Sequence, residues 1–348
     1  MIKVYIPGPF NIPIQRQFPN QEKTVWGNCE FVFQENDNYD YIVVVDSIKE
    51  EIKTLCPIER RILFLGEAPY VKIYNKKFIK QFGHIYGCQE QLIRKGVSET
   101  SIPLLPWMLG CRLQENTHIC NSEKYHTFSD FKDSKIVSTR LNKFCLITSN
   151  KTFTRGHRNR VCFAERILKE YPNLVDVYGN GYNPISDKLD ILSQYKYSIV
   201  IENCSYPNYW TEKLADCFIA GCYPVYYGCT NIHDYFSKSS LDVIDILNFD
   251  STLMQLKSIL SSTKYEDSIS AIAEAKEMVM NKYNMFSIIS HIIENIDASL
   301  LFRKESSSSI HPMQYSIKDK ILQKIAWYFN IVSVSYTQLR AHETTLHL

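Results

Sequence analysis

The sequence predicts an α/β protein with parallel β-sheets and more than one domain. Three observations lead to this prediction. The chain has 348 residues, which is more than one ordinary domain contains. Residues 41–45 and 61–65 are continuous apolar runs, the pattern of strands that are covered on both faces. In the second half of the chain, strand-like runs alternate with helix-like segments, as in a parallel sheet wound on both faces.

The first half offers strands at residues 3–6, 41–45 and 61–65, with only weakly marked helices between them. Two prolines and a polar stretch at residues 114–138 then interrupt the pattern. We therefore expect a first domain at residues 1–138, with the boundary near Ser138.

The second half, residues 139–300, is expected to form the second domain. Its predicted strands, each an apolar run, are residues 144–148, 175–179, 198–201 and 224–227. Its predicted helices, placed between and after these strands, are residues 158–171, a short one near 189, 211–220 with Gly221 as C-cap, and two that begin near 252 and 267. Ligands of such sheets bind beyond the carboxyl ends of the strands, so we expect a ligand just after Ile201 and Tyr227.

Residues 301–333 are expected to form a linker and an amphipathic C-terminal helix. Ser306 to Ser309 is predicted to be a serine linker, and residues 317–332 have apolar side chains at helical spacing together with several lysines. Docking of this helix on the protein body is the simplest prediction, and homodimer formation or contact with a membrane surface stays open. Residues 334–348 show no periodicity and resemble vector sequence, so we expect a non-native tail there.

Composition and the N-terminus limit the class of protein. The 45% hydrophobic and 22% charged residues match a globular protein, and a formal net charge of +2 is too small to favour nucleic acid as a partner. The eleven cysteines contain no C-x-x-C pair, so we expect buried thiols in a reducing compartment. Residues 1–6 lack the features of a signal peptide, and no apolar run is long enough to span a bilayer. We therefore expect a cytoplasmic protein, with peripheral contact at the inner face of the membrane left open.

A group of polar residues follows the predicted strand 198–201. Glu202 and Asn203 end that strand, and Thr211 can N-cap the next helix. Lys213 then lies in the first helical turn, where amide groups and a cation converge on any bound anion, and Glu212 can accept hydrogen bonds from sugar hydroxyls. A nucleotide with a diphosphate and a ribose diol suits this arrangement. The alternative is a purely structural strand–loop–helix unit in which Glu212 favours the helix N-terminus.

The same stretch resembles the donor-binding signature of the α-1,3-fucosyltransferase family, glycosyltransferase family 10, of bacterial type. The signature comprises Glu-Asn, a loop of this length, Y-x-T-E-K at residues 209–213 and P-x-Y-x-G at residues 224–228. The resemblance covers roughly residues 144–236 well and the first half only faintly. It implies the GT-B architecture, in which two Rossmann-like domains with parallel sheets face a central cleft.

The resemblance also implies a donor, an acceptor and site residues. Asn203, Tyr209, Glu212 and Lys213 would contact GDP-fucose, with Glu212 on the ribose and Lys213 on the phosphates. Family members also carry an arginine that grips the diphosphate, and Arg160 matches it best by its spacing from the following aromatic residue. The acceptor would be a glycan, such as a surface polysaccharide or lipopolysaccharide, and the reaction would invert the configuration at the anomeric carbon.

The assignment of Arg160 also has a physical argument. Glycosyl transfer releases a phosphate anion, so a guanidinium group stabilises the transition state more than the ground state. Arg158 is the fallback, and the alternative for both is a solvated basic start of a helix.

The reaction needs a carboxylate that takes the proton from the acceptor hydroxyl. Glu67 follows the predicted strand 61–65 and lies in an E-x-P segment similar to one in relatives, so it is the candidate base. The alternative is a glutamate that caps a turn. His84, Trp107 and the segment 103–106 are further candidates for lining the acceptor groove. The alternatives are a structural or surface role for His84 and a core position for Trp107.

No D-x-D triplet lies near a strand end, and the cations already named suffice for a diphosphate, so we expect no metal and no other cofactor. Two alternatives to a fucosyltransferase stay open: the same scaffold with another nucleotide sugar, and a noncatalytic nucleotide- or glycan-binding protein.

Overall fold

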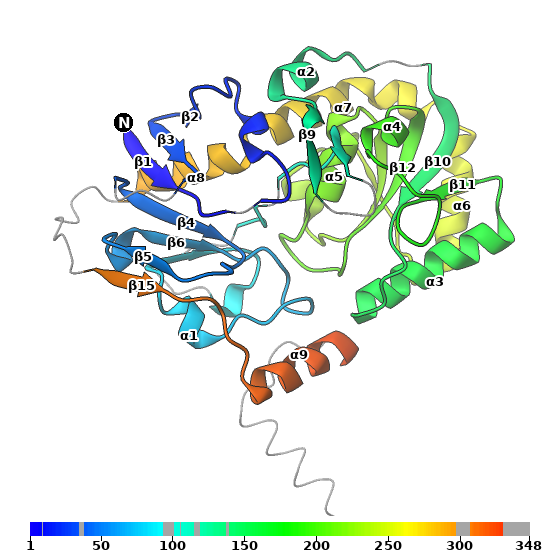
Figure 1. Ribbon diagram of the computed structural model, residues 1–348. Coiled ribbons are helices and arrows are strands. Elements are labelled where there is room, and N and C mark those ends of the chain that lie inside the picture. Colours follow the sequence, from blue (N-terminus) through cyan, green and yellow to red (C-terminus); the bar gives the residue numbers. More distant parts are fainter. Residues whose placement is uncertain are drawn as a thin grey trace, which may run out of the picture.

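The computed structural model describes residues 1–8, 10–34, 38–92, 101–104, 106–114, 119–136, 139–296 and 307–329. Within these ranges the chain builds two sheets of mainly parallel strands, each accompanied by helices (Figure 1). The predicted α/β class with parallel sheets is confirmed.

The first sheet comes from the N-terminal part of the chain and has six strands in the order β2-β3-β1-β4-β6-β7. Its strands are β1 (Ile2–Tyr5), β2 (Val25–Trp26), β3 (Cys29–Val32), β4 (Tyr41–Val45), β6 (Arg61–Phe64) and β7 (His84–Tyr86). All neighbouring strands are parallel except the hairpin of β2 and β3. The three strands predicted for this half are present, and the short strands β2, β3 and β7 were not predicted.

The second sheet is wholly parallel and has the order β11-β10-β12-β13-β14. Its strands are β10 (Leu141–Ile147), β11 (Val175–Tyr178), β12 (Tyr195–Ile201), β13 (Tyr223–Tyr227) and β14 (Asp242–Val243). The helices that accompany it are α3 (Arg155–Glu170), α4 (Leu189–Leu192), α5 (Glu212–Ile219), α6 (Phe249–Leu260) and α7 (Lys264–Met280). Gly221 has a φ of 72° just after α5, which confirms its predicted place at the end of that helix.

Several smaller elements complete the chain. They are β5 (Ile52–Thr54), α1 (Lys76–Ile79), β8 (Cys111–Leu113), β9 (Cys120–Tyr125), α2 (Phe128–Asp133), α8 (Met285–Asn295), β15 (Ser308–Ile310) and α9 (Ile317–Phe329). Strand β9 lies inside the stretch 114–138 that was marked only as polar, and it pairs antiparallel with β8, which precedes that stretch.

Helix α8 lies on the first sheet, although residues 139–300 were assigned to the second domain (Figure 1). Phe286 stacks on Phe18 with ring centroids 3.8 Å apart, and Ile289 and Ile293 are buried in the same core. No helix was predicted at residues 285–295, and the apolar face of a helix does not reveal which of two sheets it covers. The boundary near Ser138 and the end of the second domain at residue 300 lie outside the described residues.

The predicted serine linker is partly wrong. Residues Ser308–Ile310 form β15, which pairs antiparallel with β5. The side chain of Ile310 is buried there, and this apolar contact with strand pairing outweighs the turn preference of serine. Residues 301–306 and the predicted tail 334–348 lie outside the described residues.

Helix α9 docks on the protein body and touches both halves of the chain (Figure 1). Trp327 Nε1 donates a hydrogen bond of 2.8 Å to the carbonyl of Val71, and Gln323 Oε1 accepts one of 2.7 Å from the amide of Ile73. On the other side, Arg158 of α3 donates to the carbonyl of Trp327 at 3.3 Å. Contact with a membrane or a second copy stays a prediction. None of the helices in the described ranges is long and apolar enough to cross a bilayer.

All eleven cysteines are free thiols. Ten of them are buried and only Cys162 is exposed, as expected for structural thiols.

The packing of α8 gives a first prediction. Phe286→Ala removes a buried ring from the core that ties α8 to the first sheet, so the free energy of unfolding falls by about 3–5 kcal/mol. Urea unfolding followed by circular dichroism measures it. Met254→Ala on α6, where the side chain is 68% exposed, is the control and changes that free energy by no more than about 0.5 kcal/mol. Equal effects of the two substitutions would contradict the placement of α8.

Candidate active site

The carboxyl ends of β6 and β12 meet between the two sheets. Glu67 lies three residues beyond β6, and Glu202 directly follows β12. The loop after β12 reaches across to the first sheet, where the hydroxyl of Tyr209 donates a hydrogen bond of 2.6 Å to Glu67 Oε2. The predicted ligand position beyond Ile201 is therefore also the place where the two halves of the chain touch.

The carboxylate of Glu202 is completely buried and organises the start of α5. It accepts hydrogen bonds from the amide of Thr211 at 2.8 Å, from the hydroxyl of Thr211 at 2.7 Å and from Lys213 Nζ at 3.1 Å. Burial raises the pKa of Glu202, and Lys213 opposes this rise. No separate role was predicted for this glutamate, because a polar residue after a strand usually belongs to a solvated loop.

Lys213 stands in the first turn of α5, as predicted. Its ammonium group lies 3.1 Å from Glu202 and 3.3 Å from Glu212. Burial disfavours the positive charge, but the two carboxylates outweigh burial and raise the pKa of Lys213 above its usual value. Burial also opposes ionisation of Glu212, yet Lys213 and Lys188 prevail and lower the pKa of Glu212 to about 2. This ion pair is therefore fully charged at neutral pH.

Arg160 lies on the face of α3 that turns toward the same loop, and only 5% of it is exposed. Its guanidinium donates to Asn203 Oδ1 at 2.9 Å and to Ser149 Oγ at 3.2 Å, and its Nε has no hydrogen-bond partner. Within the described part of the chain, no carboxylate lies within ion-pair distance of Arg160. Burial lowers the pKa of Arg160, but an arginine stays charged in proteins, so this buried cation lacks an anion.

The two cations belong to one electrostatic site. Arg160 contacts Asn203 and Lys213 contacts Glu202, which are adjacent in sequence. His157 is buried in the first turn of α3, close enough to both cations for them to affect its pKa. Burial, then Arg160 and then Lys213 lower the pKa of His157 to about 4. The imidazole is therefore neutral at pH 7 and adds no further charge.

Arg158, the fallback for the phosphate-binding arginine, points elsewhere. Its guanidinium contacts the carbonyl of Trp327 and lies 4.9 Å from the ring centroid of Tyr328, both on α9. This leaves Arg160 as the arginine of the pair that faces the Glu202–Asn203 corner.

Two glycines allow the site to close tightly. A Cβ added to Gly156 in the first turn of α3 would lie 1.9 Å from the carbonyl oxygen of Asn203. A Cβ added to Gly228 after β13 would lie 2.4 Å from Cγ of Glu202. Backbone contact at these points holds α3 and β13 against the corner that carries both cations.

The main chain of Glu67 is held by its own half of the protein. Gln89 Nε2 donates to the carbonyl of Glu67 at 2.8 Å, and the amide of Glu67 donates to the hydroxyl of Tyr74 at 3.2 Å. Burial raises the pKa of the Glu67 carboxyl to about 7, against the opposing effects of Tyr209 and Lys213. A carboxyl group that titrates near neutral pH at a cleft is suited to general base catalysis.

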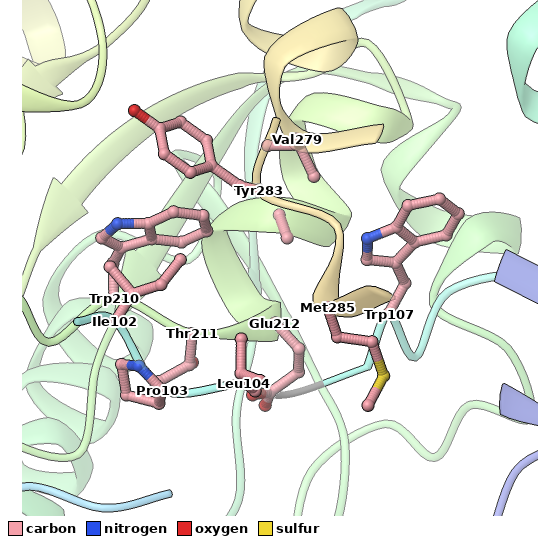
Figure 2. Close-up of a pocket in the computed structure, with 11 residues that line it drawn as sticks. Ile102, Pro103, Leu104, Trp107, Trp210, Thr211, Glu212, Val279, Tyr283 and Met285 are labelled. Atoms are coloured by element: carbon pink, nitrogen blue, oxygen red, sulfur yellow. The ribbon is translucent and has the colours of Figure 1, made fainter. Parts of the chain in front are cut away.

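The candidates for lining the acceptor groove lie elsewhere. His84 pairs with Ile62 at the amino end of the first sheet, and Glu67 lies beyond the carboxyl end. Trp107 is only 2% exposed and packs in the core. Pro103 and Trp107 line an internal cavity of about 10 Å³ beside Glu212, which has room for a single water molecule (Figure 2). Trp107 thus has the core position that was the alternative for it, and a role of His84 or of the segment 103–106 at an acceptor groove stays a prediction.

A larger hollow of about 340 Å³ lies beyond the carboxyl ends of β1 and β3. Its lining is mainly apolar with a few polar groups and consists of Gly8, Phe10, Asn11, Ile12, Pro13, Ile14, Gln15, Phe33, Ile119 and Cys120. Strands β1 and β6 are separated by β4 alone, so this hollow is about 10 Å along the sheet from the strand that presents Glu67. It was not found from the sequence, because its lining comes from three separate segments.

The described residues contain no group of three or more histidine, cysteine, aspartate or glutamate side chains placed to hold a metal ion.

The part of the chain that forms the second sheet is similar to a known protein family. Residues 137–268 match the model of glycosyltransferase family 10 (fucosyltransferase), C-terminal domain. Alpha-(1,3)-fucosyltransferase FucT of Helicobacter pylori is 36% identical over 78 residues, which is 22% of this chain and 16% of the relative. Alpha-(1,3)-fucosyltransferase B of Drosophila melanogaster is 30% identical over 146 residues, which is 40% of this chain and 31% of the relative. The chain thus aligns with less than a third of either relative.

The fold extends the likeness over both sheets. A crystal structure of an alpha1,3-fucosyltransferase with GDP-fucose superposes with a TM-score of 0.50 and 17% identity, covering 88% of this chain and 93% of that one. A second crystal structure of an alpha1,3-fucosyltransferase gives a TM-score of 0.50 and 16% identity over the same shares of the two chains. The predicted GT-B architecture is confirmed.

The contact at Gly156 gives a second prediction. Alanine normally stabilises a helix relative to glycine, but Gly156→Ala forces α3 away from Asn203, so the free energy of unfolding falls by about 1–3 kcal/mol. Thermal and urea unfolding measure it. Gly8→Ala, where the added Cβ meets nothing closer than 3.6 Å, is the matched control and leaves the stability nearly unchanged. A more stable Gly156→Ala protein would show that α3 and the loop are not in contact.

Proposed function

We propose that this chain, whose residues 137–268 form a glycosyltransferase family 10 domain, transfers fucose from GDP-fucose to a hydroxyl group of a glycan. One observation carries the proposal: the buried guanidinium of Arg160 has no carboxylate partner and lies beside Lys213 at the N-terminus of α5. Lys213 has Glu202 and Glu212 as partners, but no carboxylate of the described residues contacts Arg160, and a diphosphate that reaches both cations supplies an anion for it. The names of the two relatives, and the GDP-fucose in the similar structure, support this donor.

The proposed donor site uses the predicted residues in distinct ways. Arg160 and Lys213 hold the two phosphates and stabilise the charge that develops on GDP as the sugar leaves. Asn203 fixes the guanidinium of Arg160 through its Oδ1 atom. Glu212, ionised at neutral pH, is proposed to accept hydrogen bonds from the ribose hydroxyls. Since two fixed cations neutralise the phosphates, we propose that the reaction proceeds without a metal ion.

The acceptor is proposed to approach from the first sheet. Its hydroxyl oxygen attacks the anomeric carbon of fucose while Glu67 takes the proton, and the bond from that carbon to the phosphate oxygen breaks. Attack opposite the leaving GDP inverts the configuration. The hollow beyond β1 and β3 is proposed to hold a sugar of the acceptor, because Phe10 and Phe33 offer apolar ring faces and Asn11 offers a polar group. A surface polysaccharide or lipopolysaccharide is the proposed source of this glycan.

The donor site gives a third prediction. Isothermal titration with GDP-fucose, GDP, UDP-glucose and CDP compares the nucleotides, and GDP-fucose and GDP bind most tightly. Lys213→Ala and Arg160→Ala each weaken GDP binding about 10- to 100-fold, because each removes a charged hydrogen-bond donor. The EDTA-treated protein binds GDP equally well.

The control for these substitutions is Lys169→Ala, on the exposed face of α3, which leaves the affinity unchanged. If UDP-glucose bound more tightly than GDP-fucose, the donor would be a nucleotide sugar other than GDP-fucose. Binding of GDP without any product from GDP-fucose and a panel of oligosaccharides would instead favour a noncatalytic binding protein.

The base gives a fourth prediction. Glu67→Gln lowers turnover about 10²- to 10⁴-fold and keeps the GDP affinity within about twofold, since the amide cannot take a proton. Only the ionised form of Glu67 is a base, so turnover of the unchanged protein rises with pH through about 7 and falls off below it. A pH series of initial rates measures this, with exposed Glu59→Gln as a control that matches the unchanged protein. Full turnover by Glu67→Gln would remove Glu67 from the mechanism.

A further inference from the structure

We propose that Tyr209 is a positioning residue for the base: its hydroxyl, supplied by the donor-binding half of the protein, orients the carboxylate of Glu67 in the other half. The inference rests on the proposed function, in which Glu67 is the base. It differs from the role that the family resemblance implies for this tyrosine, which is contact with GDP-fucose.

The geometry of the contact is specific. The hydroxyl of Tyr209 donates to Glu67 Oε2 at 2.6 Å, and the tyrosine is completely buried. Among the hydrogen bonds of the described residues, this is the one that reaches the carboxylate of Glu67. Gln89 and Tyr74 hold the main chain of Glu67, but they do not fix the direction of its side chain. Tyr209 therefore decides where the two carboxylate oxygens point.

The surroundings of this hydrogen bond are dry and come from both halves of the chain. Ala68 and Cys88 from the first half and Cys204 and Tyr209 from the second half form one buried cluster. At its edge the rings of Tyr70 and Tyr206 meet with their centroids 5.7 Å apart. Exclusion of water strengthens a hydrogen bond and makes its loss costly. The cluster thus holds the two halves together where the base is aimed.

The loop that carries Tyr209 is itself fixed to the second half. Asn208 has a φ of 59°, a left-handed conformation that asparagine tolerates better than most residues. Asn231 Oδ1 accepts a hydrogen bond of 2.8 Å from the main-chain amide of Asn208. The hydroxyl of Tyr235 donates one of 2.6 Å to the side-chain Oδ1 of Asn208. The Tyr209 hydroxyl therefore arrives at Glu67 from a preorganised loop, and it does not need to be ordered during the reaction.

This arrangement divides the work between the oxygens of Glu67. Oε2 is occupied by Tyr209, so Oε1 is the atom that accepts the proton of the acceptor hydroxyl. The hydrogen bond from Tyr209 favours the ionised carboxylate and so opposes the rise in pKa that burial causes. Since the donor of this bond comes from the nucleotide-binding half, the carboxylate of Glu67 is oriented by Tyr209 only while the two halves are in contact.

Tyr209→Phe tests the proposal, because it deletes the hydroxyl and keeps the buried ring. We expect turnover to fall about 10- to 100-fold and the acid limb of the pH profile to move to higher pH, while GDP affinity stays within about twofold. Tyr206→Phe is the matched control, since the hydroxyl of Tyr206 makes no hydrogen bond within the described residues, and it should behave like the unchanged protein. In the double variant Glu67→Gln/Tyr209→Phe, the second substitution adds no further loss.

Each other outcome overturns the inference. Unchanged turnover and pH profile in Tyr209→Phe would show that the hydroxyl does not position Glu67. Weaker GDP binding with an unchanged pH profile would place Tyr209 on the donor instead. Full turnover of Glu67→Gln alone would overturn the proposed base together with this inference, whereas a loss in Glu67→Gln with none in Tyr209→Phe would overturn the inference alone.

Discussion

A buried carboxylate constrains the whole site. Glu202 has no access to water, so its charge is tolerable only with strong donors around it, and Thr211 and Lys213 provide them. This requirement fixes the first turn of α5 against the end of β12 and holds the ammonium of Lys213 in place. It also leaves the neighbouring Asn203 free to bind Arg160, which brings the second cation to the same corner.

A site of this kind is built for an anion. His157 stays neutral beside the two cations. Glu202 and Glu212 both contact Lys213, whereas no carboxylate of the described residues contacts Arg160, so Arg160 is the cation that a bound anion would pair with. The half of the protein that binds the anion also reaches across to the base through a single loop. Contact between the halves is reinforced elsewhere, because α8 covers the first sheet and α9 touches both halves. Chemistry and domain contact therefore depend on the same loop after β12.

The sequence predicted the second sheet well and the first sheet poorly, for a physical reason. Strands β10 to β13 contain apolar runs followed by helical segments, whereas β2, β3 and β7 of the first sheet are too short for any periodicity to show. Glu67 was proposed from its place after a strand, Glu212 and Lys213 from the start of a helix, and Arg160, Asn203 and Tyr209 from the family resemblance. Their partners in the fold are set by distant segments. The choice between Arg158 and Arg160 depends on α9, and the destination of the Tyr209 hydroxyl depends on Glu67 in the other half. The importance of Glu202 follows from burial, which a single strand-end residue does not reveal.

The proposed function depends above all on a nucleotide diphosphate that lies between Arg160 and Lys213. A crystal structure of the protein with GDP tests this most directly. The account predicts phosphate oxygens at hydrogen-bond distance, about 3 Å, from both the guanidinium and the ammonium group. A diphosphate that touches neither cation, or a nucleotide bound on another face of the second sheet, would contradict it.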